Sequence, residues 1–165
     1  MYFTGKYGII KSMKKRNVIG CFERVSFPDF QGVSRIAKID TGAFTGSIHA
    51  TNIKSDRRKH ILSFNLFGKK KYYCELRNYK IVPARVANGE ESRRYIAPFH
   101  IEIAGKTYET LLTLSDRTEM NRRVLIGRRF LKNNGFLIDT NLHSEFDREW
   151  KTKGVKGENS YFIKW

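Results

Sequence analysis

The chain has 165 residues, and 32 Lys or Arg against 16 Asp or Glu give it a formal net charge of +16 at pH 7. Hydrophobic residues make up 40% of it and aromatic residues 13%, which suits one folded domain with a core and excludes a disordered chain. Apolar runs fall short of the roughly 20 residues that a membrane helix needs, and residues 1–6 carry no signal core, so we expect a cytoplasmic protein without a membrane partner.

The positive charge indicates an anionic partner, which the composition leaves open as nucleic acid, ribosome or acidic peptide. The basic residues are dispersed, and no helix-turn-helix, zinc-finger or RNP-type motif accompanies them. The two cysteines, Cys21 and Cys74, are expected to be buried thiols in a reducing compartment. No Cys-x-x-Cys, His-Glu-x-x-His or phosphate-binding Gly-rich spacing occurs, so the sequence predicts no metal and no cofactor.

Short alternating segments predict a mainly β protein. Residues 1–16 are interpreted as a basic arm, 17–146 as the domain and 147–165 as a basic tail. The predicted strands cover residues 18–25, 34–40, 45–51, 61–67, 72–75, 79–86, 93–103, 108–114, 124–126 and 136–139. Pro98 is expected to break its strand, and one short helix is predicted over 127–133 with Gly135 near its end. Many short strands with a single late helix favour a small closed barrel of six or more strands.

The predicted strand over residues 34–40 ends at Asp40-Thr41-Gly42-Ala43. A carboxylate here can activate a water molecule, the Thr hydroxyl can lock the turn, and Gly permits a close backbone approach. The sequence resembles the active-site signature of pepsin-like and retroviral-type aspartic proteases. Such enzymes need two carboxylates that share a proton, so a chain with one copy is expected to form a homodimer. An ordinary turn capped by Asp40 is the alternative reading of the tetrapeptide.

Four further blocks extend this resemblance. Together with residues 38–50, they cover residues 88–96, 113–120, 125–131 and 138–139. The five blocks resemble the bacterial retropepsin-like proteins long labelled ATP-dependent zinc proteases, which are sometimes associated with glutamate-ligase systems. The resemblance implies a retropepsin-like (acid protease) barrel and an aspartic rather than a zinc active site. Two departures, Phe44-Thr45-Gly46 for the usual Arg-Thr-Ser and Ala87-Asn88-Gly89 for Ser-x-Gly, bear on substrate preference.

The resemblance also assigns roles to residues outside the tetrapeptide. An apolar pair followed by Gly127 is expected to cross beside the Asp-Thr-Gly loop and lead into the helix, although a plain buried strand has the same pattern. The hairpin at Asn88-Gly89 is the candidate flap over the substrate, and an exposed turn fits it equally well. The residues expected to form the flap or bind substrate are Asn88, Gly89, Glu90, Arg93, Arg94 and Arg128.

Structural support is expected from Asp116, Arg117, Gly127 and His49. Asp116 and Arg117 are interpreted as an ion pair, while an arginine that receives an acidic substrate side chain remains an alternative. His49 has no partner at ligand spacing, so we interpret it as a hydrogen-bonded structural residue. The sequence Asp139-Thr140-Asn141 lacks the Gly of a second signature and is interpreted as a strand end.

The leading hypothesis is a homodimeric aspartic endopeptidase in which two Asp40 carboxylates activate a water molecule. The charge adds a narrower hypothesis, an acidic or glutamate-extended protein tail as substrate, with the ribosome or a glutamate ligase as associated partner. Three alternatives stay open: a non-catalytic module that binds an acidic partner, an RNA- or ribosome-associated protein, and a true metallopeptidase.

Overall fold

The computed structural model describes residues 16–85 and 91–146, and the side chains of residues 84, 85, 91 and 92 are not described. Residues 1–15 of the predicted arm, the predicted tail and the hairpin residues Asn88, Gly89 and Glu90 lie outside the described part. The strands are β1 (Val18–Ile19), β2 (Phe22–Phe27), β3 (Val33–Asp40), β4 (Gly46–Asp56), β5 (Ile61–Leu66), β6 (Tyr73–Leu76), β7 (Lys80–Arg85), β8 (Glu91–Ile103), β9 (Lys106–Ser115), β10 (Val124–Gly127) and β11 (Leu137–Ile138). The helix α1 spans Arg128–Asn133, and 3₁₀ turns cover Pro28–Phe30 and Lys70–Tyr72.

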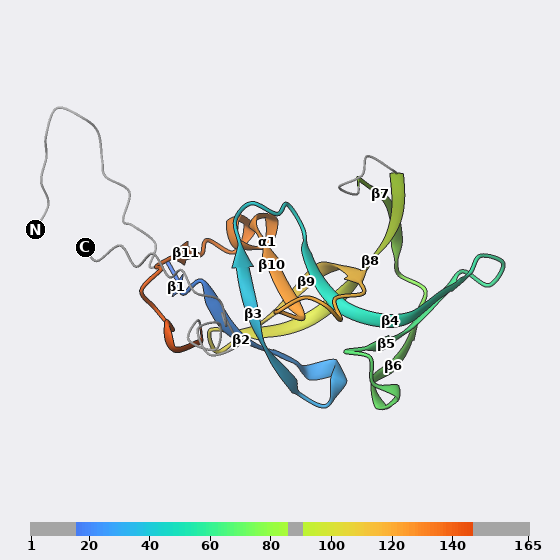
Figure 1. The fold of residues 1–165 in the computed structure, drawn as a ribbon, viewed down its shortest axis with the longest axis horizontal. Coiled ribbons are helices and arrows are strands. Elements are labelled where there is room, and N and C mark those ends of the chain that lie inside the picture. Colours follow the sequence, from blue (N-terminus) through green and yellow to red (C-terminus); the bar gives the residue numbers. More distant parts are fainter. Residues whose placement is uncertain (1–15, 86–90, 147–165) are drawn as a thin grey trace, which may run out of the picture.

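Six strands close into a barrel. Their order is β10-β3-β2-β8-β9-β4, and β4 pairs again with β10 to complete the circuit. Strands β5 and β6 continue from β4, β7 pairs with β8, and β1 pairs with β11 in a separate two-stranded sheet. Figure 1 shows β1 and β11 at one end of the molecule and β5 and β6 at the other. The predicted mainly β fold, a closed retropepsin-like barrel with one short helix, is confirmed.

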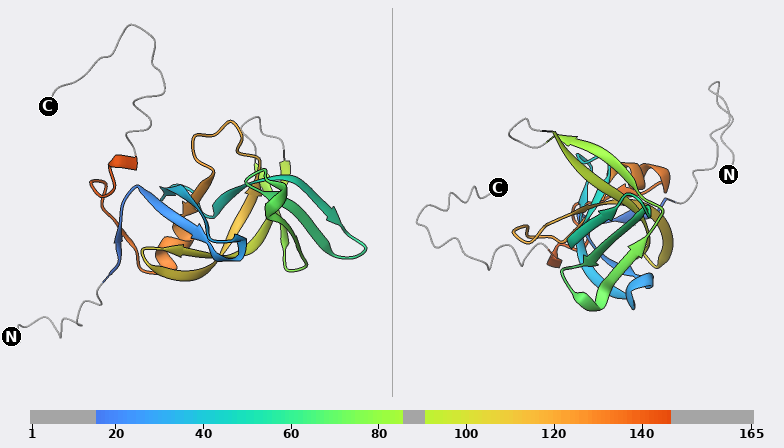
Figure 2. Two further views of the ribbon diagram at one scale, coloured as in Figure 1. Left: turned by 90° about the horizontal axis from the view of Figure 1, so that it is seen from below. Right: turned by 90° about the vertical axis from the view of Figure 1, so that its right-hand side faces the viewer.

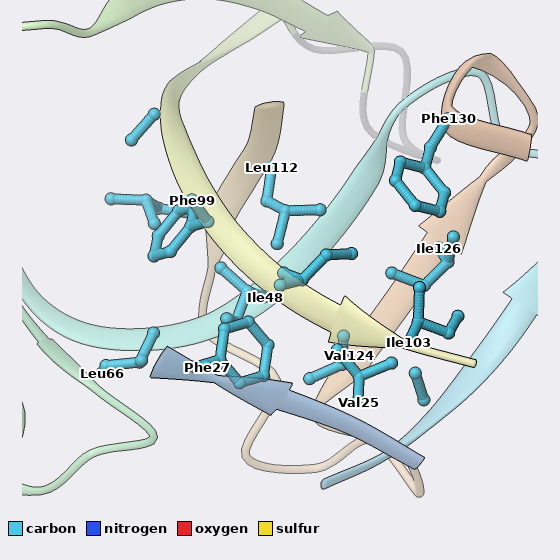
Figure 3. Close-up of a cluster of buried hydrophobic side chains, with 14 of the residues drawn as sticks. Val25, Phe27, Ile48, Leu66, Phe99, Ile103, Leu112, Val124, Ile126 and Phe130 are labelled. Atoms are coloured by element: carbon cyan, nitrogen blue, oxygen red, sulfur yellow. The ribbon is translucent and has the colours of Figure 1, made fainter. Parts of the chain in front are cut away.

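Alternation along the barrel strands builds a single core. Ile48 in β4, Leu112 in β9 and both Val124 and Ile126 in β10 are at most 1% exposed. Their side chains converge with Phe27 of β2 inside the barrel (Figure 3). Because β-strand side chains alternate between faces, the residues between these positions point away from the core. The outward positions are therefore where polar and functional side chains can lie.

The structure corrects two predicted strands. The strand predicted over residues 18–25 is split into β1 and β2, and at Gly20 an added Cβ would meet the Leu142 backbone. Pro98 does not break β8, because it pairs with Leu111 of β9 and stands where β8 has no second neighbour. The neighbouring strand β7 begins at Lys80, opposite Ile96, and β2 pairs with β8 only at Glu102, so the N–H that proline lacks is not required there.

The cysteines also differ from expectation. Cys21 and Cys74 are unpaired and only half-buried, rather than buried. Burial raises the pKa of the Cys74 thiol, which therefore stays protonated near neutral pH. None of the helices in the described part of the chain is long and apolar enough to cross a membrane.

Candidate active site

At the end of β3, two backbone N–H groups hold the carboxylate of Asp40, an arrangement that we call the cradle of Asp40. Asp40 is half-buried, and its Oδ1 accepts hydrogen bonds from the backbone N–H groups of Gly42 (3.1 Å) and Ala43 (3.0 Å). Thr41 and Gly42 are exposed. An added Cβ on Gly42 would lie 3.3 Å from that same Oδ1, so glycine suits this tight turn. The turn fixes one carboxylate oxygen, and in the described part of the chain no hydrogen bond engages the other oxygen, Oδ2.

Strand β10 passes between the two strands that flank this turn. It runs parallel to β3, with Gly127 opposite Asp40, and antiparallel to β4, with Leu125 opposite Ser47. An added Cβ on Gly127 would lie 2.5 Å from the carbonyl carbon of Thr45. Only glycine therefore allows the crossing strand to touch the loop that follows the candidate catalytic turn.

The start of α1 also holds this loop, through two backbone hydrogen bonds. The backbone N–H of Arg128 donates to the Ala43 carbonyl (2.8 Å), and that of Arg129 donates to the Phe44 carbonyl (3.1 Å). In Figure 1 the loop after β3 lies beside α1. Backbone hydrogen bonds from a helix start leave little freedom to the turn that carries Asp40.

The Arg128 side chain holds the loop as well. Its Nη1 donates to the Gly42 carbonyl (2.6 Å), and its guanidinium lies 5.6 Å from the centre of the Phe44 ring. The structure engages the Arg128 side chain in the candidate catalytic loop, an arrangement that favours a positioning role, and substrate binding by Arg128 stays a prediction.

The loop over residues 116–123 covers the outward face of β4. His49 is 4% exposed, and its Nδ1 accepts the backbone N–H of Arg117 at 2.8 Å. Burial lowers the pKa of His49, the charge of Arg123 lowers it further, and Asp116 opposes them. A neutral imidazole that accepts at Nδ1 carries its proton on Nε2. His49 is thus placed as a hydrogen-bonded residue that ties β4 to the loop.

The expected ion pair between Asp116 and Arg117 is not formed. The Asp116 carboxylate accepts from the Thr118 hydroxyl (2.6 Å) and backbone N–H (2.9 Å), and these bonds lower its pKa. Arg117 turns the other way, where Nη1 donates to Ser47 Oγ (3.0 Å) and Nε to the Arg122 carbonyl (2.9 Å). The two neighbours separate because Asp116 finds its partner within its own turn, whereas Arg117 finds its partners on β4 and at the Arg122 carbonyl.

The structure describes only part of the predicted flap. Strands β7 and β8 pair up to Arg85 opposite Glu91, so an antiparallel ribbon leads toward the predicted hairpin. On the returning strand, Arg93 is exposed and Arg94 is half-buried. Both views of Figure 2 place this ribbon and the loop over residues 116–123 on the same side of the barrel.

Sequence reasoning missed two residues of this region. Ser47 is 8% exposed and accepts from Arg117, and Arg123 Nη1 donates to the Arg117 carbonyl at 2.6 Å. The alternation of Ser47 and His49 with apolar neighbours was the available signal, since it marks a polar face on the strand that leaves the Asp-Thr-Gly turn. Nothing local to Arg123 indicates its role. Within the described residues, no group of three or more His, Cys, Asp or Glu side chains is arranged to hold a metal ion.

Asp139 does not supply a second carboxylate to the turn. It follows β11 in the separate two-stranded sheet, and its Oδ1 accepts from the Asn141 backbone N–H at 2.9 Å. Its interpretation as a strand end agrees with this position. The described part of one chain therefore brings a single Asp-Thr-Gly carboxylate to the junction of β3, β4 and β10.

Comparisons with known proteins agree with this arrangement. Two proteins named probable alpha-L-glutamate ligase, from Shewanella pealeana and Shewanella halifaxensis, are each 36% identical to the chain over 124 residues, or 70% of its length. The chain spans only 27% of the length of these relatives. A Legionella pneumophila protein of unknown function has a similar fold, with a TM-score of 0.61, 24% identity, and coverage of 78% of this chain and 96% of that one. The family described as retropepsin-like aspartic endopeptidase RimB matches residues 18–148. The chain therefore belongs to the RimB-like family of retropepsin-like aspartic endopeptidases.

Proposed function

We propose that the protein is an aspartic peptidase whose active site forms between two copies of the chain, each contributing Asp40. The observation that carries this proposal is the cradle of Asp40, where Gly42 and Ala43 hold one carboxylate oxygen and the crossing strand at Gly127 fixes the loop behind it. Thr41 and Ala43 complete the turn. The proposed catalytic unit spans residues 17–146.

The chemistry needs both carboxylates because each has a separate task. Two carboxylates about 3 Å apart share one proton, so one of them is a base and the other an acid. The base takes a proton from a water molecule whose oxygen attacks the peptide carbonyl, while the acid donates its proton to the carbonyl oxygen. The resulting tetrahedral intermediate breaks its C–N bond as a proton passes to the leaving nitrogen. The products are a carboxyl group and an amine, and no covalent enzyme intermediate forms.

Exposure near the turn supports a dimer at this position. Thr41 and Gly42 are exposed, and Phe44 is 59% exposed. An exposed aromatic side chain beside a polar turn suits a surface that another chain covers. We propose that Thr41 hydrogen-bonds across the two-fold axis and fixes the two turns against each other.

The proposed substrate is an acidic peptide, with glutamate as the favoured residue. The net charge of +16 attracts acidic chains, and the relatives named probable alpha-L-glutamate ligase point to glutamate chemistry. An acidic protein tail extended by such a ligase is the substrate class that fits both observations. Association with a ligase or a ribosome is proposed on the same grounds.

The test compares wild type with Asp40→Asn on a peptide library that includes Glu-rich members. Mass spectrometry records cleavage from acidic to neutral pH, with a chelator present throughout. Cleavage by wild type and not by Asp40→Asn supports the aspartic mechanism. Cleavage that survives Asp40→Asn but is abolished by the chelator would favour a metallopeptidase. A strictly monomeric protein in sedimentation, inactive on every peptide, would favour a binding module.

A further inference from the structure

Asp40 and Ser47 lie on the same outward face of the barrel wall. Lys38 of β3 and Ser47 of β4 both stand opposite Leu125 in the strand between them. Asp40 follows Lys38 by two residues and therefore shares its face, whereas the intervening Ile39 is buried in the core. The candidate catalytic carboxylate and Ser47 thus flank one strand on its solvent side.

The same face continues to Arg94. Ser47 stands opposite Thr113 of β9, and Thr113 stands opposite Ile96 of β8. Arg94 precedes Ile96 by two residues, so the alternation places it on this face too. The strand register therefore sets Asp40, Ser47 and Arg94 along one surface, although 54 residues separate the first from the last in the chain.

Arg117 lies over this surface with its guanidinium fixed. Nη1 donates to Ser47 Oγ and Nε donates to the Arg122 carbonyl, while Arg123 holds the Arg117 carbonyl. In the described part of the chain no hydrogen bond engages the Nη2 group of Arg117, and no hydrogen bond or ion pair engages the Arg94 guanidinium. Arg117 and Arg94 therefore lie on the face that carries Asp40, each with N–H donors that no described group engages.

The charges of Arg94, Asp40 and Arg123 all act on Arg117. Burial lowers the pKa of Arg117, the charge of Arg94 lowers it further, and Asp40 acts in the opposite direction. Arg123 adds to the repulsion. A half-buried guanidinium that faces two like charges is stabilised when an anion joins it. Because screening by salt is weaker for partly buried charges, this preference for an anion persists at physiological ionic strength.

We propose that Arg117 and Arg94 form a subsite that binds the carboxylate side chain of a substrate residue next to the cleaved bond. The proposal rests on the proposed function and assigns its acidic preference to two residues rather than to overall charge. A guanidinium held in one orientation can present two parallel N–H donors to a carboxylate, which dispersed surface lysines cannot do. Ser47 is then a positioning residue that orients Arg117.

The kinetic test uses pairs of peptides that differ only by Glu or Gln beside the cleaved bond. We expect wild type to cleave the Glu member with a kcat/KM about tenfold or more above that of the Gln member, as charge-assisted hydrogen bonds imply. Arg117→Gln and Arg94→Gln should each reduce this ratio toward one. Arg57→Gln is the matched control, because it removes the same charge from an exposed turn between β4 and β5. A ratio that both substitutions leave at the wild-type value would overturn the subsite.

A binding test separates this proposal from the proposed function. The Asp40→Asn protein is titrated with the same peptides in a calorimeter at two salt concentrations. Tighter binding of the Glu peptide, lost when Arg94→Gln is added, supports the subsite even if wild type cleaves nothing, in which case only the proposed function fails. Equal binding of the two peptides, or a preference that survives both arginine substitutions, contradicts the subsite. If Arg117→Gln unfolds because it loses the hydrogen bond to Ser47, the Arg94→Gln variant alone tests the subsite. The Arg94 side chain makes no hydrogen bond of this kind in the described part of the chain.

Discussion

Gly127 stands directly opposite Asp40 in the parallel pairing of β10 with β3, and its missing side chain is what lets the loop after Asp40 touch the crossing strand. An added Cβ would lie 2.5 Å from the carbonyl carbon of Thr45 and 2.8 Å from the nitrogen of Gly46. Both contacts are backbone, so no side-chain rotation can relieve them. The geometry of the turn and the stability of the barrel are therefore linked at this position.

The first prediction follows from that contact. Gly127→Ala should lower the free energy of unfolding by about 3 kcal/mol, near the upper end for overpacking, and should abolish Asp40-dependent cleavage. Denaturant unfolding measures the loss. Gly105→Ala is the control, because its φ of 72° carries a backbone cost of about 1–2 kcal/mol while an added Cβ meets no atom within 4 Å. Equal losses at the two glycines would contradict the proposed role of the close contact.

The second prediction concerns Arg128. Arg128→Ala removes the bond to the Gly42 carbonyl and the contact with Phe44, so kcat should fall about tenfold while KM changes little. Arg129→Ala is the matched control, since its exposed side chain makes no hydrogen bond in the described part of the chain. A rise in KM with kcat unchanged would support the substrate-binding role that the sequence predicts for Arg128.

The third prediction concerns pH and His49. Burial holds the pKa of His49 below its ordinary value of 6.5, so the unfolded chain takes up this proton first as the pH falls. The stability contributed by the neutral imidazole is complete above pH 6.5 and is lost progressively as the pH drops below it. Urea titrations from pH 8 to pH 5 measure this slope.

Two variants complete the pH experiment. His49→Asn keeps an acceptor near the position of Nδ1 and should flatten the pH dependence of stability below pH 6.5. His60→Asn is the control, because it is exposed and its φ of 52° suits asparagine. A slope that persists in His49→Asn would assign the acid sensitivity to another group.

The fourth prediction tests the proposed dimer through Thr41. Thr41→Ala should raise the dimer dissociation constant about tenfold or more, because the substitution removes one hydroxyl from each copy at the two-fold axis. Thr41→Ser retains the hydroxyl and should retain the dimer. Sedimentation equilibrium gives both constants, and identical values for the two variants would contradict a cross-axis bond.

Local sequence patterns predicted most of the elements, because strands and turns depend on how apolar and polar residues alternate over short stretches of the chain. The predicted segments over residues 34–40, 61–67 and 124–126 agree with β3, β5 and β10 to within one residue at each end. The error at residues 18–25 arose because the Gly20 break is set by a contact with Leu142, far away in the chain. The error at Pro98 arose because a proline is tolerated where a strand lacks a neighbour, which depends on sheet order.

By itself, the sequence determined the Asp-Thr-Gly-Ala turn, the glycine of the crossing strand and the mainly β barrel, since each depends on residue types at short spacing. Only the tertiary structure decided what the arginines do. Arg128 reaches back 86 residues to Gly42, and Arg117 reaches back 70 residues to Ser47 instead of pairing with its neighbour Asp116. The physical reason is that a long side chain on a loop selects its partners by what the strand register brings within hydrogen-bond distance, and no local pattern encodes that register.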